Sequence, residues 1–189
     1  MQTIDGTTQT VTRGYLEIDA SIDVEIADLV CEEKERIWLN AIADVAKAMS
    51  AHHVHSGALI ANSVEASVLV GSNARVQALN ATFRGQDKPT NVLSFPTPEG
   101  HATHPSENNS EPTHIGDCIL ALGVLETEAA ERDIPVLHHV QHLVVHGILH
   151  LLGYAHETNS SDADKMEAIE TDILRTLGIA DPYDETIAM

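Results

Sequence analysis

The spacing of apolar residues changes along this chain, from every second position near its start to every third or fourth position later. From Leu16 to Ile26 the apolar residues alternate with other residues, which is typical of a strand with one buried face. Residues 32–49 have helical spacing instead. Further strands are predicted at 64–70, 92–95 and 115–122, and further helices at 73–83, 126–132, 136–152 and 161–177. Strands that mostly precede helices predict an α+β fold, in which a small mixed sheet of about four strands packs against several helices.

The length and composition fit one domain over residues 1–189. With 43% hydrophobic and only 3% aromatic residues, the core must be built from aliphatic side chains. Segment 97–113 is rich in polar residues and proline, which predicts a flexible surface loop. Cys31 and Cys118 are far apart and form no Cys-x-x-Cys pair, so neither a disulfide framework nor a cysteine metal site is expected. The chain has no long apolar stretch and no signal-peptide pattern, so we expect a cytoplasmic protein without a membrane segment.

The net charge of −19 argues against a general nucleic-acid binder, which usually has a basic surface. The acidic residues are unevenly distributed, however. Residues 71–95 contain Arg75, Arg84 and Lys88 but only one acidic residue, Asp87. This segment is either a patch that faces an anion or a chance gap among the acidic residues.

The residue types best suited to chemistry lie at the end of the apolar helix over 136–152. His146 and His150 are four residues apart, so their imidazoles share one helix face and can converge on one metal ion. Gly153 can adopt a left-handed conformation that ends the helix and lets the chain turn back, so that His156 reaches the same ion. Three protein ligands leave a fourth position open, which is typical of catalytic zinc. We therefore predict a zinc site at the exit of a core helix.

Other interpretations of the histidines have to be weighed. The chain has 12 histidines, and His138, His139 and His142 continue the same four-residue spacing. We expect these three to be solvated or hydrogen-bonded residues of the helix. The ligand spacing also resembles that of metzincin metalloproteases, which have a glutamate as general base directly after the first histidine. Gly147 occupies that position here, so a zinc metalloprotease is the less favoured alternative.

A second motif helps to choose between these interpretations of the histidines. The histidine motif, taken with the segment Lys88-Pro89-Thr90-Asn91-Val92-Leu93-Ser94-Phe95-Pro96, resembles the YbeY family of ribosomal RNA maturation endonucleases. The similarity covers residues 64–177 and includes Leu79-Asn80, Gly116-Asp117 and a helix with Met166 and Glu170.

The resemblance implies an α+β fold with one zinc ion and single-strand-specific cleavage of RNA. It also implies roles in maturing the 3′ end of 16S ribosomal RNA and in ribosome quality control, with the ribosome or a ribosome-associated protein as partner. A zinc-containing ribosome assembly factor without catalytic activity is the remaining alternative.

The resemblance also suggests roles for residues outside the histidine motif. Arg84 matches the family's arginine near the metal, which implies a catalytic residue that binds the substrate phosphate; a structural salt bridge is the alternative. Lys88 is a second candidate for substrate binding. For Asn91 and Ser94 we expect turn and strand hydrogen bonds.

One position departs from the family's pattern. The family usually has aspartate directly before the last histidine, and this chain has Ala155. Another group must then orient a ligand or accept a proton, and Asp117 and Glu157 are the candidates. Asp117 could equally cap the start of a strand.

Overall fold

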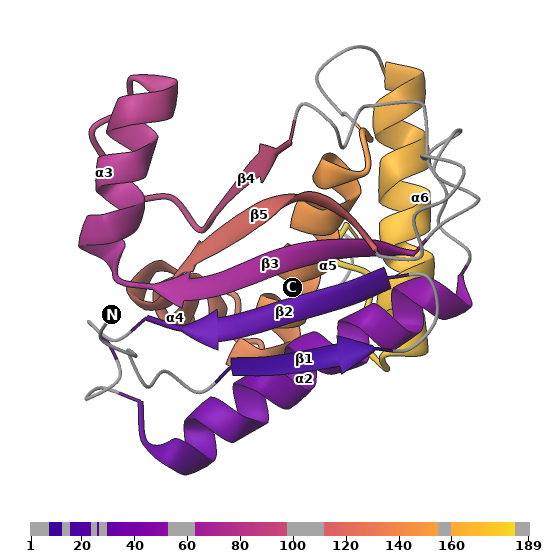
Figure 1. Cartoon of the computed structure of the whole chain (residues 1–189), viewed down its shortest axis with the longest axis horizontal. Coiled ribbons are helices and arrows are strands. Elements are labelled where there is room, and N and C mark those ends of the chain that lie inside the picture. The colour runs from indigo at the N-terminus through magenta and orange to yellow at the C-terminus, as the bar shows by residue number, and fades with distance from the viewer. Residues whose placement is uncertain are drawn as a thin grey trace.

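The computed structural model describes residues 8–12, 16–23, 26, 30–52, 63–97, 112–154 and 160–183. The predictions for His156, Glu157 and most of segment 97–113 fall outside the described residues. The described elements are β1 (Thr8–Thr12), β2 (Leu16–Ile22), α2 (Glu32–Ala51), β3 (Val64–Gly71), α3 (Asn73–Arg84), β4 (Val92–Pro96), β5 (Thr113–Ala121), α4 (Leu122–Glu131), α5 (Val136–Leu151) and α6 (Ser160–Thr176) (Figure 1).

The strands form one mixed sheet in the order β1-β2-β3-β5-β4. The three central strands β2, β3 and β5 run parallel, and each edge strand pairs antiparallel with its neighbour. The α+β class and the mixed sheet are confirmed, but the sheet has five strands where about four were expected. The strand that was not predicted is β1. Its sequence, Thr-Gln-Thr-Val-Thr, contains a single apolar residue and therefore has no apolar alternation.

Strand β2 occupies the first part of the alternating segment, which confirms the strand predicted there. It ends at Ile22, and the chain then turns, with the Ile26 N–H donating to the Asp23 carbonyl. The buried Asp23 carboxylate forms an ion pair with Arg75 of α3. This ion pair lies directly after the last residue of the strand.

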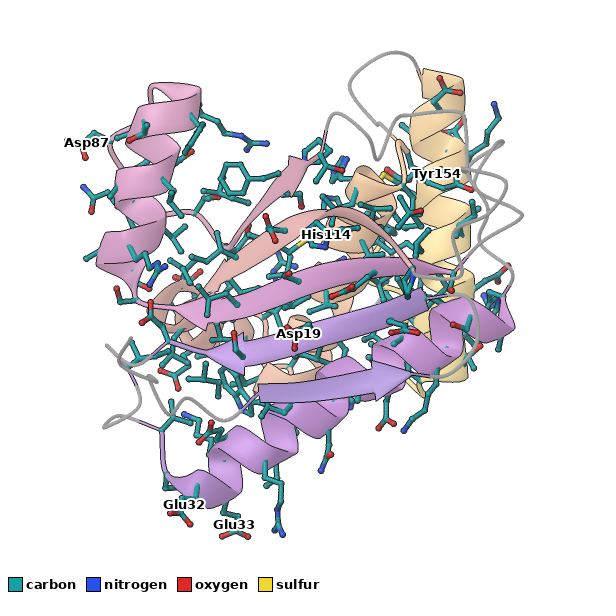
Figure 2. The ribbon with its side chains drawn as sticks, viewed as in Figure 1. Asp19, Glu32, Glu33, Asp87, His114 and Tyr154 are labelled. Carbon is teal, nitrogen blue, oxygen red and sulfur yellow. The ribbon has the colours of Figure 1, made fainter. Side chains whose placement is uncertain are left out.

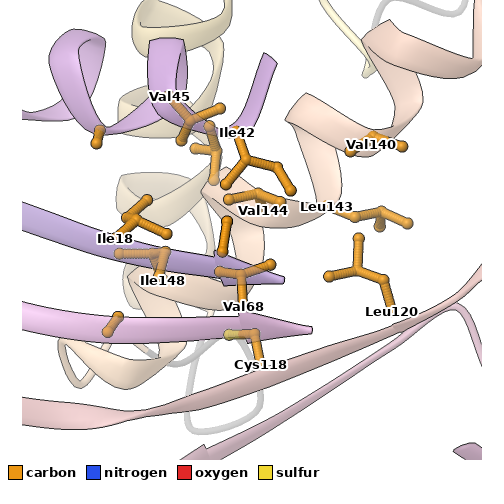
Figure 3. Close-up of a cluster of buried hydrophobic side chains, with 14 of the residues drawn as sticks. Ile18, Ile42, Val45, Val68, Cys118, Leu120, Val140, Leu143, Val144 and Ile148 are labelled. Carbon is orange, nitrogen blue, oxygen red and sulfur yellow. The ribbon is translucent and has the colours of Figure 1, made fainter. Parts of the chain in front are cut away.

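The core fills the space between the sheet and the helices α2 and α5 (Figure 3). Every second residue of the central strands faces this space: Ile18 of β2, Val68 of β3 and Leu120 of β5 are buried there, against Ile42 of α2 and Val144 of α5. Burying an aliphatic side chain of this size contributes about 1.5–3 kcal/mol. The core is aliphatic, as the composition predicted.

Helix α2 places one apolar side against the sheet. Trp38 and Ile42 are buried, whereas Ile37 is 41% exposed because it falls just outside the buried stripe. Glu32 and Glu33 in the first turn point away from the sheet, where negative charge complements the helix dipole (Figure 2). None of the described helices is long and apolar enough to cross a membrane.

Helix α3 lies apart from α2, α5 and α6 (Figure 1). It begins where the Ser72 side chain accepts the N–H of Arg75 and ends at Gly85, which has a left-handed φ of 68°. A second, smaller core joins α3 to the sheet and consists of Val76, Leu93, Ile119 and Ala121.

Candidate metal centre

Helix α5 lies unusually close to the sheet at Gly147. A Cβ at that position would be 2.9 Å from Cys118 Sγ and 3.2 Å from Ser94 Oγ. The Ser94 hydroxyl donates to the Gly147 carbonyl at 3.3 Å, which ties β4 to the helix. Burial raises the pKa of the Cys118 thiol to about 12, so this side chain stays protonated and packs as an apolar group. The close contact fixes the rotation of α5 and thereby the direction of its remaining side chains.

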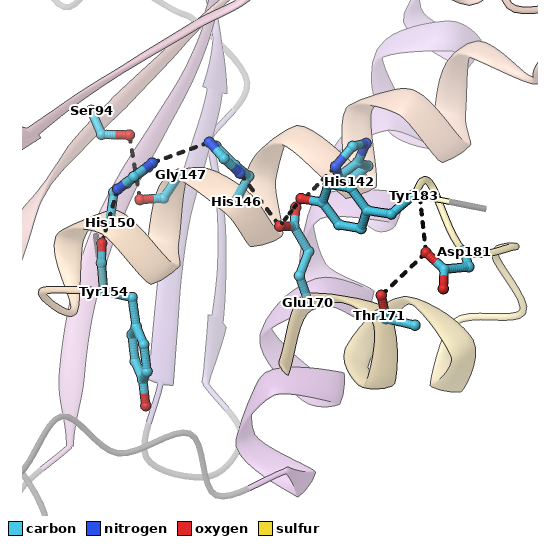
Figure 4. Close-up of polar contacts among 10 residues, drawn as sticks. All are labelled: Ser94, His142, His146, Gly147, His150, Tyr154, Glu170, Thr171, Asp181 and Tyr183. Atoms are coloured by element: carbon cyan, nitrogen blue, oxygen red, sulfur yellow. Dashed lines mark hydrogen bonds and ion pairs between the residues drawn. The ribbon is translucent and has the colours of Figure 1, made fainter. Parts of the chain in front are cut away.

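His146 and His150 lie on either side of Gly147 and are half-buried. Their Nε2 atoms are 3.1 Å apart (Figure 4). The other ring nitrogens have partners of their own: His150 Nδ1 lies 3.0 Å from the Tyr154 carbonyl, and His146 Nδ1 lies 3.4 Å from Glu170 Oε2. The structure thus brings together two of the three predicted ligands.

The pair fits a bound metal ion. A carbonyl and an ionised carboxylate only accept hydrogen bonds, so each histidine uses its ring proton on Nδ1. Both Nε2 atoms then carry lone pairs, and two lone pairs facing each other repel unless a cation lies between them. Two nitrogens about 2.0–2.1 Å from one tetrahedral zinc ion are about 3.3 Å apart, close to the separation observed here. A histidine that donates its second nitrogen to such an acceptor is the usual form of a metal ligand.

The helix ends where the sequence predicted. Gly153 has a φ of 87°, and the Gly153 and Tyr154 N–H groups donate to the carbonyls of His150 and Leu149. This turn carries the chain out of the helix toward His156, which is not among the described residues. Within the described part of the chain, no three histidine, cysteine or acidic side chains are arranged so that they could hold a metal ion. The third ligand therefore remains a prediction.

Glu170 of α6 is fully buried beside the histidine pair, and the sequence motifs did not assign it a role. Its carboxylate contacts His146 Nδ1, lies 2.9 Å from His142 Nε2, and accepts the Tyr183 hydroxyl at 2.7 Å. Burial opposes the negative charge, but the hydrogen bonds from the two histidines outweigh it and lower the pKa of Glu170 to about 2. Burial, followed by the Glu170 charge, raises the pKa of Tyr183. Glu170 is thus an ionised acceptor that holds the proton of His146 on Nδ1.

The segment after α6 closes over this cluster. Asp181 accepts both the Thr171 hydroxyl, at 3.3 Å, and the Tyr183 N–H, at 2.9 Å (Figure 4). These bonds hold Tyr183 where its hydroxyl reaches Glu170. Glu170 is 24 residues from His146 in the sequence, so no local spacing rule could have paired them.

Asp117 does not lie beside the histidine pair. It is 60% exposed, and its carboxylate contacts the ring of His114 at 3.3 Å. Neighbouring residues of a strand point to opposite faces, and Cys118 faces α5. Asp117 therefore faces the other side of the sheet and is not positioned to orient His146 or His150.

Arg84 and Lys88 lie at the end of α3 and in the turn after it, and both are exposed. Within the described residues, neither charged group forms a hydrogen bond or ion pair. The structural salt bridge considered for Arg84 therefore has no acidic partner among them. The Lys88 carbonyl accepts the Asn80 side-chain amide at 2.8 Å, which fixes the turn. The catalytic and substrate-binding roles of Arg84 and Lys88 remain predictions.

The expected structural roles of several polar residues are confirmed. Asn91 donates to Glu128 at 3.1 Å and accepts the Val92 N–H, as expected for a turn residue. His139 is buried with its Nε2 2.7 Å from Glu128, and His142 binds Glu170. His139 is therefore a hydrogen-bonded helix residue, as expected, and His142 lies within ion-pair distance of Glu170.

Comparison with known proteins places the chain in a family. The family model described as Endoribonuclease YbeY matches residues 29–178. Proteins named Endoribonuclease YbeY from Novosphingobium aromaticivorans and Magnetococcus marinus are each 48% identical, over 62% and 64% of this chain and 71% and 83% of their own length. The Rhodopseudomonas palustris protein of that name is 42% identical over 80% of this chain and 81% of its own. A solution structure of TM1509 from Thermotoga maritima, 20% identical, covers 89% of this chain and 99% of that one with a TM-score of 0.49. This chain belongs to the YbeY family.

Proposed function

We propose that this protein is a metal-dependent endoribonuclease that cuts single-stranded RNA and acts in maturing the 3′ end of small-subunit ribosomal RNA. The observation that carries the proposal is the 3.1 Å separation of the Nε2 atoms of His146 and His150, whose Nδ1 atoms each face an oxygen acceptor. The relatives' shared name supplies the reaction class.

His146, His150 and His156 would hold one zinc ion. Bound there, zinc would supply a Lewis acid that polarises a phosphate oxygen or lowers the pKa of a water molecule. The chain's own groups have separate tasks. Glu170 and the Tyr154 carbonyl hold the ring protons on Nδ1 and so orient the imidazoles. The guanidinium of Arg84 stays charged and can donate two parallel hydrogen bonds to a phosphate.

The structure speaks against the protease alternative. A metzincin would need glutamate at position 147, but Gly147 is buried against Cys118 and Ser94. Even a single added carbon would come within 2.9 Å of the Cys118 sulfur, so the larger glutamate side chain has no room. This chain has no carboxylate at that position that could act as a general base.

The charge of the whole chain suggests how its substrate is chosen. A protein with a net charge of −19 attracts bulk RNA poorly. We therefore include in the proposal a ribosomal or ribosome-associated partner that supplies selectivity, and a cytoplasmic location, where ribosomes are assembled.

The test combines metal analysis with RNA cleavage by the purified chain. We expect about one zinc per chain and cleavage of a single-stranded oligoribonucleotide that a chelator abolishes and added zinc restores. His146→Ala should lose both the metal and the activity. Arg84→Ala should keep the metal and the fold but cleave at least about tenfold more slowly, if its guanidinium stabilises charge in the transition state. Arg36→Ala, which removes an exposed cation on α2, is the matched control.

Three outcomes would count against the proposal. Full cleavage by Arg84→Ala would remove the role given to that residue. Retention of zinc with no cleavage, together with unfolding on metal removal, would favour the non-catalytic assembly factor. The chemical ends of the cleaved RNA show which nucleophile attacks the phosphate. A 2′,3′-cyclic phosphate would show attack by the RNA's own 2′-hydroxyl instead of water.

A further inference from the structure

A groove lies between α3 and the face of the sheet that α5 does not cover. Its volume is about 680 Å³, within the usual range for ligand sites. Phe83 and Leu79 of α3 line it on one side and Phe95 of β4 on the other, with Ser67 and Asp117 from the central strands. Asp117 pairs in register with both Ser67 and Phe95, so these three side chains lie next to one another on one face. The groove is thus mostly apolar, with a few polar groups from the sheet.

Phe83 is the most prominent apolar group in this groove. It is 66% exposed, compared with 41% for Ile37 and 41% for Tyr183, the other large apolar side chains that are exposed among the described residues. Its ring packs edge to face against Phe95, with centroids 5.2 Å apart and an interplanar angle of 67°. This contact holds the Phe83 ring in place and leaves most of its surface open. A fixed, open aromatic ring is suited to stacking against another flat ring.

Two basic residues lie close to Phe83 in the sequence, although neither is among the residues that line the groove. Arg84 follows Phe83 directly, and Lys88 lies in the turn beyond α3. Neither charged group has a hydrogen-bond or ion-pair partner within the described ranges. Both belong to segment 71–95, which has a positive net charge in a chain of net charge −19. A flat apolar ring joined to negative charge is the chemistry of a nucleotide, and it matches this combination of groups.

We propose that the groove holds one unstacked base of single-stranded RNA, stacked against Phe83. The inference rests on the proposed function and adds to it a base-binding site on the sheet face opposite the histidine pair. Bases in a duplex are stacked on each other and cannot enter such a groove. A base site here would therefore contribute to selection of single strands.

The test measures binding separately from cleavage. A fluorescent single-stranded oligoribonucleotide is titrated with the full chain in the presence of a chelator, which prevents cutting, and fluorescence anisotropy gives the dissociation constant. We expect Phe83→Ala to weaken binding about tenfold, the typical loss for one stacked base. Phe83→Tyr keeps the ring and should bind like the wild type. Ile37→Ala, which removes another exposed apolar side chain, is the matched control, and circular dichroism checks that every variant folds.

An oligonucleotide with abasic sites keeps the phosphates and removes the bases. The wild type should bind it about as weakly as Phe83→Ala binds the intact strand, and Phe83→Ala should show no further loss. Equal affinities of wild type and Phe83→Ala for intact RNA would overturn the inference and leave the groove as a surface for a protein partner. Absence of any RNA binding would overturn it as well. Normal binding by a wild type that never cleaves RNA would refute the proposed activity but not the base site.

Discussion

At the scale of single residues, the histidine pair depends on groups that the metal would not touch. His146 can present an unprotonated Nε2 only while its Nδ1 proton has an acceptor, and Glu170 is that acceptor. The carboxylate is surrounded by donors, since His142 and Tyr183 also point at it. Its low pKa of about 2 means that it remains an acceptor at any physiological pH.

We predict that Glu170→Gln weakens zinc binding about 10- to 100-fold, the usual effect of losing a histidine's outer partner. A glutamine has one acceptor oxygen, and its NH₂ group would face another donor. Competition with a chromophoric chelator measures the affinity, and ¹⁵N NMR of the His146 ring in the metal-free protein reports which nitrogen carries the proton.

Glu167→Gln is the control, because Glu167 is exposed on the same helix. If Glu170→Gln binds zinc as tightly as the wild type and the proton stays on Nδ1, Glu170 does not position His146.

At the scale of elements, glycine determines how α5 is placed and where it ends. Gly147 allows the helix to approach the sheet, and Gly153 ends it with a φ of 87°. A left-handed conformation costs a residue with a side chain about 1–2 kcal/mol. The two glycines therefore fix both the direction of the histidines and the point where the chain can turn back.

We predict that Gly153→Ala lowers the free energy of unfolding by about 1 kcal/mol and also weakens zinc binding, because the altered exit misplaces His156. Gly85→Ala is a matched control: Gly85 has a φ of 68° and no heavy atom within 4 Å of the added carbon, and it ends α3. It should lose similar stability in urea denaturation but keep its zinc affinity. Equal zinc affinities of the two variants would show that the turn at Gly153 does not deliver a ligand.

At the scale of the whole molecule, the acidic residues oppose the substrate that the site is proposed to cut. Arg84 and Lys88 are exposed cations without an ion-pair partner within the described residues. Non-specific RNA binding should therefore involve few phosphates and depend weakly on salt.

We predict that the isolated chain binds arbitrary single-stranded RNA with a dissociation constant of about 10⁻⁶ M or weaker at physiological salt. With two phosphate contacts, a plot of log affinity against log salt concentration should have a slope of about −1.4. Arg84→Ala should bring it to about −0.7, and Arg36→Ala should leave it unchanged. Anisotropy titrations over a range of salt concentrations test this, and tight binding with a steep slope would contradict it.

Much of the fold follows from local patterns. The strand over Val64–Gly71 and the helix over Val136–Leu151 lie where alternation and helical spacing predicted them. The predictions failed where contact with a distant part of the chain determines whether a strand forms. Strand β1 was not predicted, because it has little apolar character and exists through its pairing with β2. Pairing energy and buried charge pairs come from contacts between distant segments, which periodicity does not contain.

The sequence alone determined the helix that carries His146 and His150 and the glycine that ends it. An α-helix sets which residues share a face, and a left-handed turn at the helix end favours glycine. Tertiary structure decided which groups surround that helix. It brought Glu170 and Tyr183 to His146, turned Asp117 to the opposite face, and placed Phe83 against Phe95 to form a groove. The physical reason is that local spacing is a property of the backbone, whereas these contacts arise only when the helices pack on the sheet.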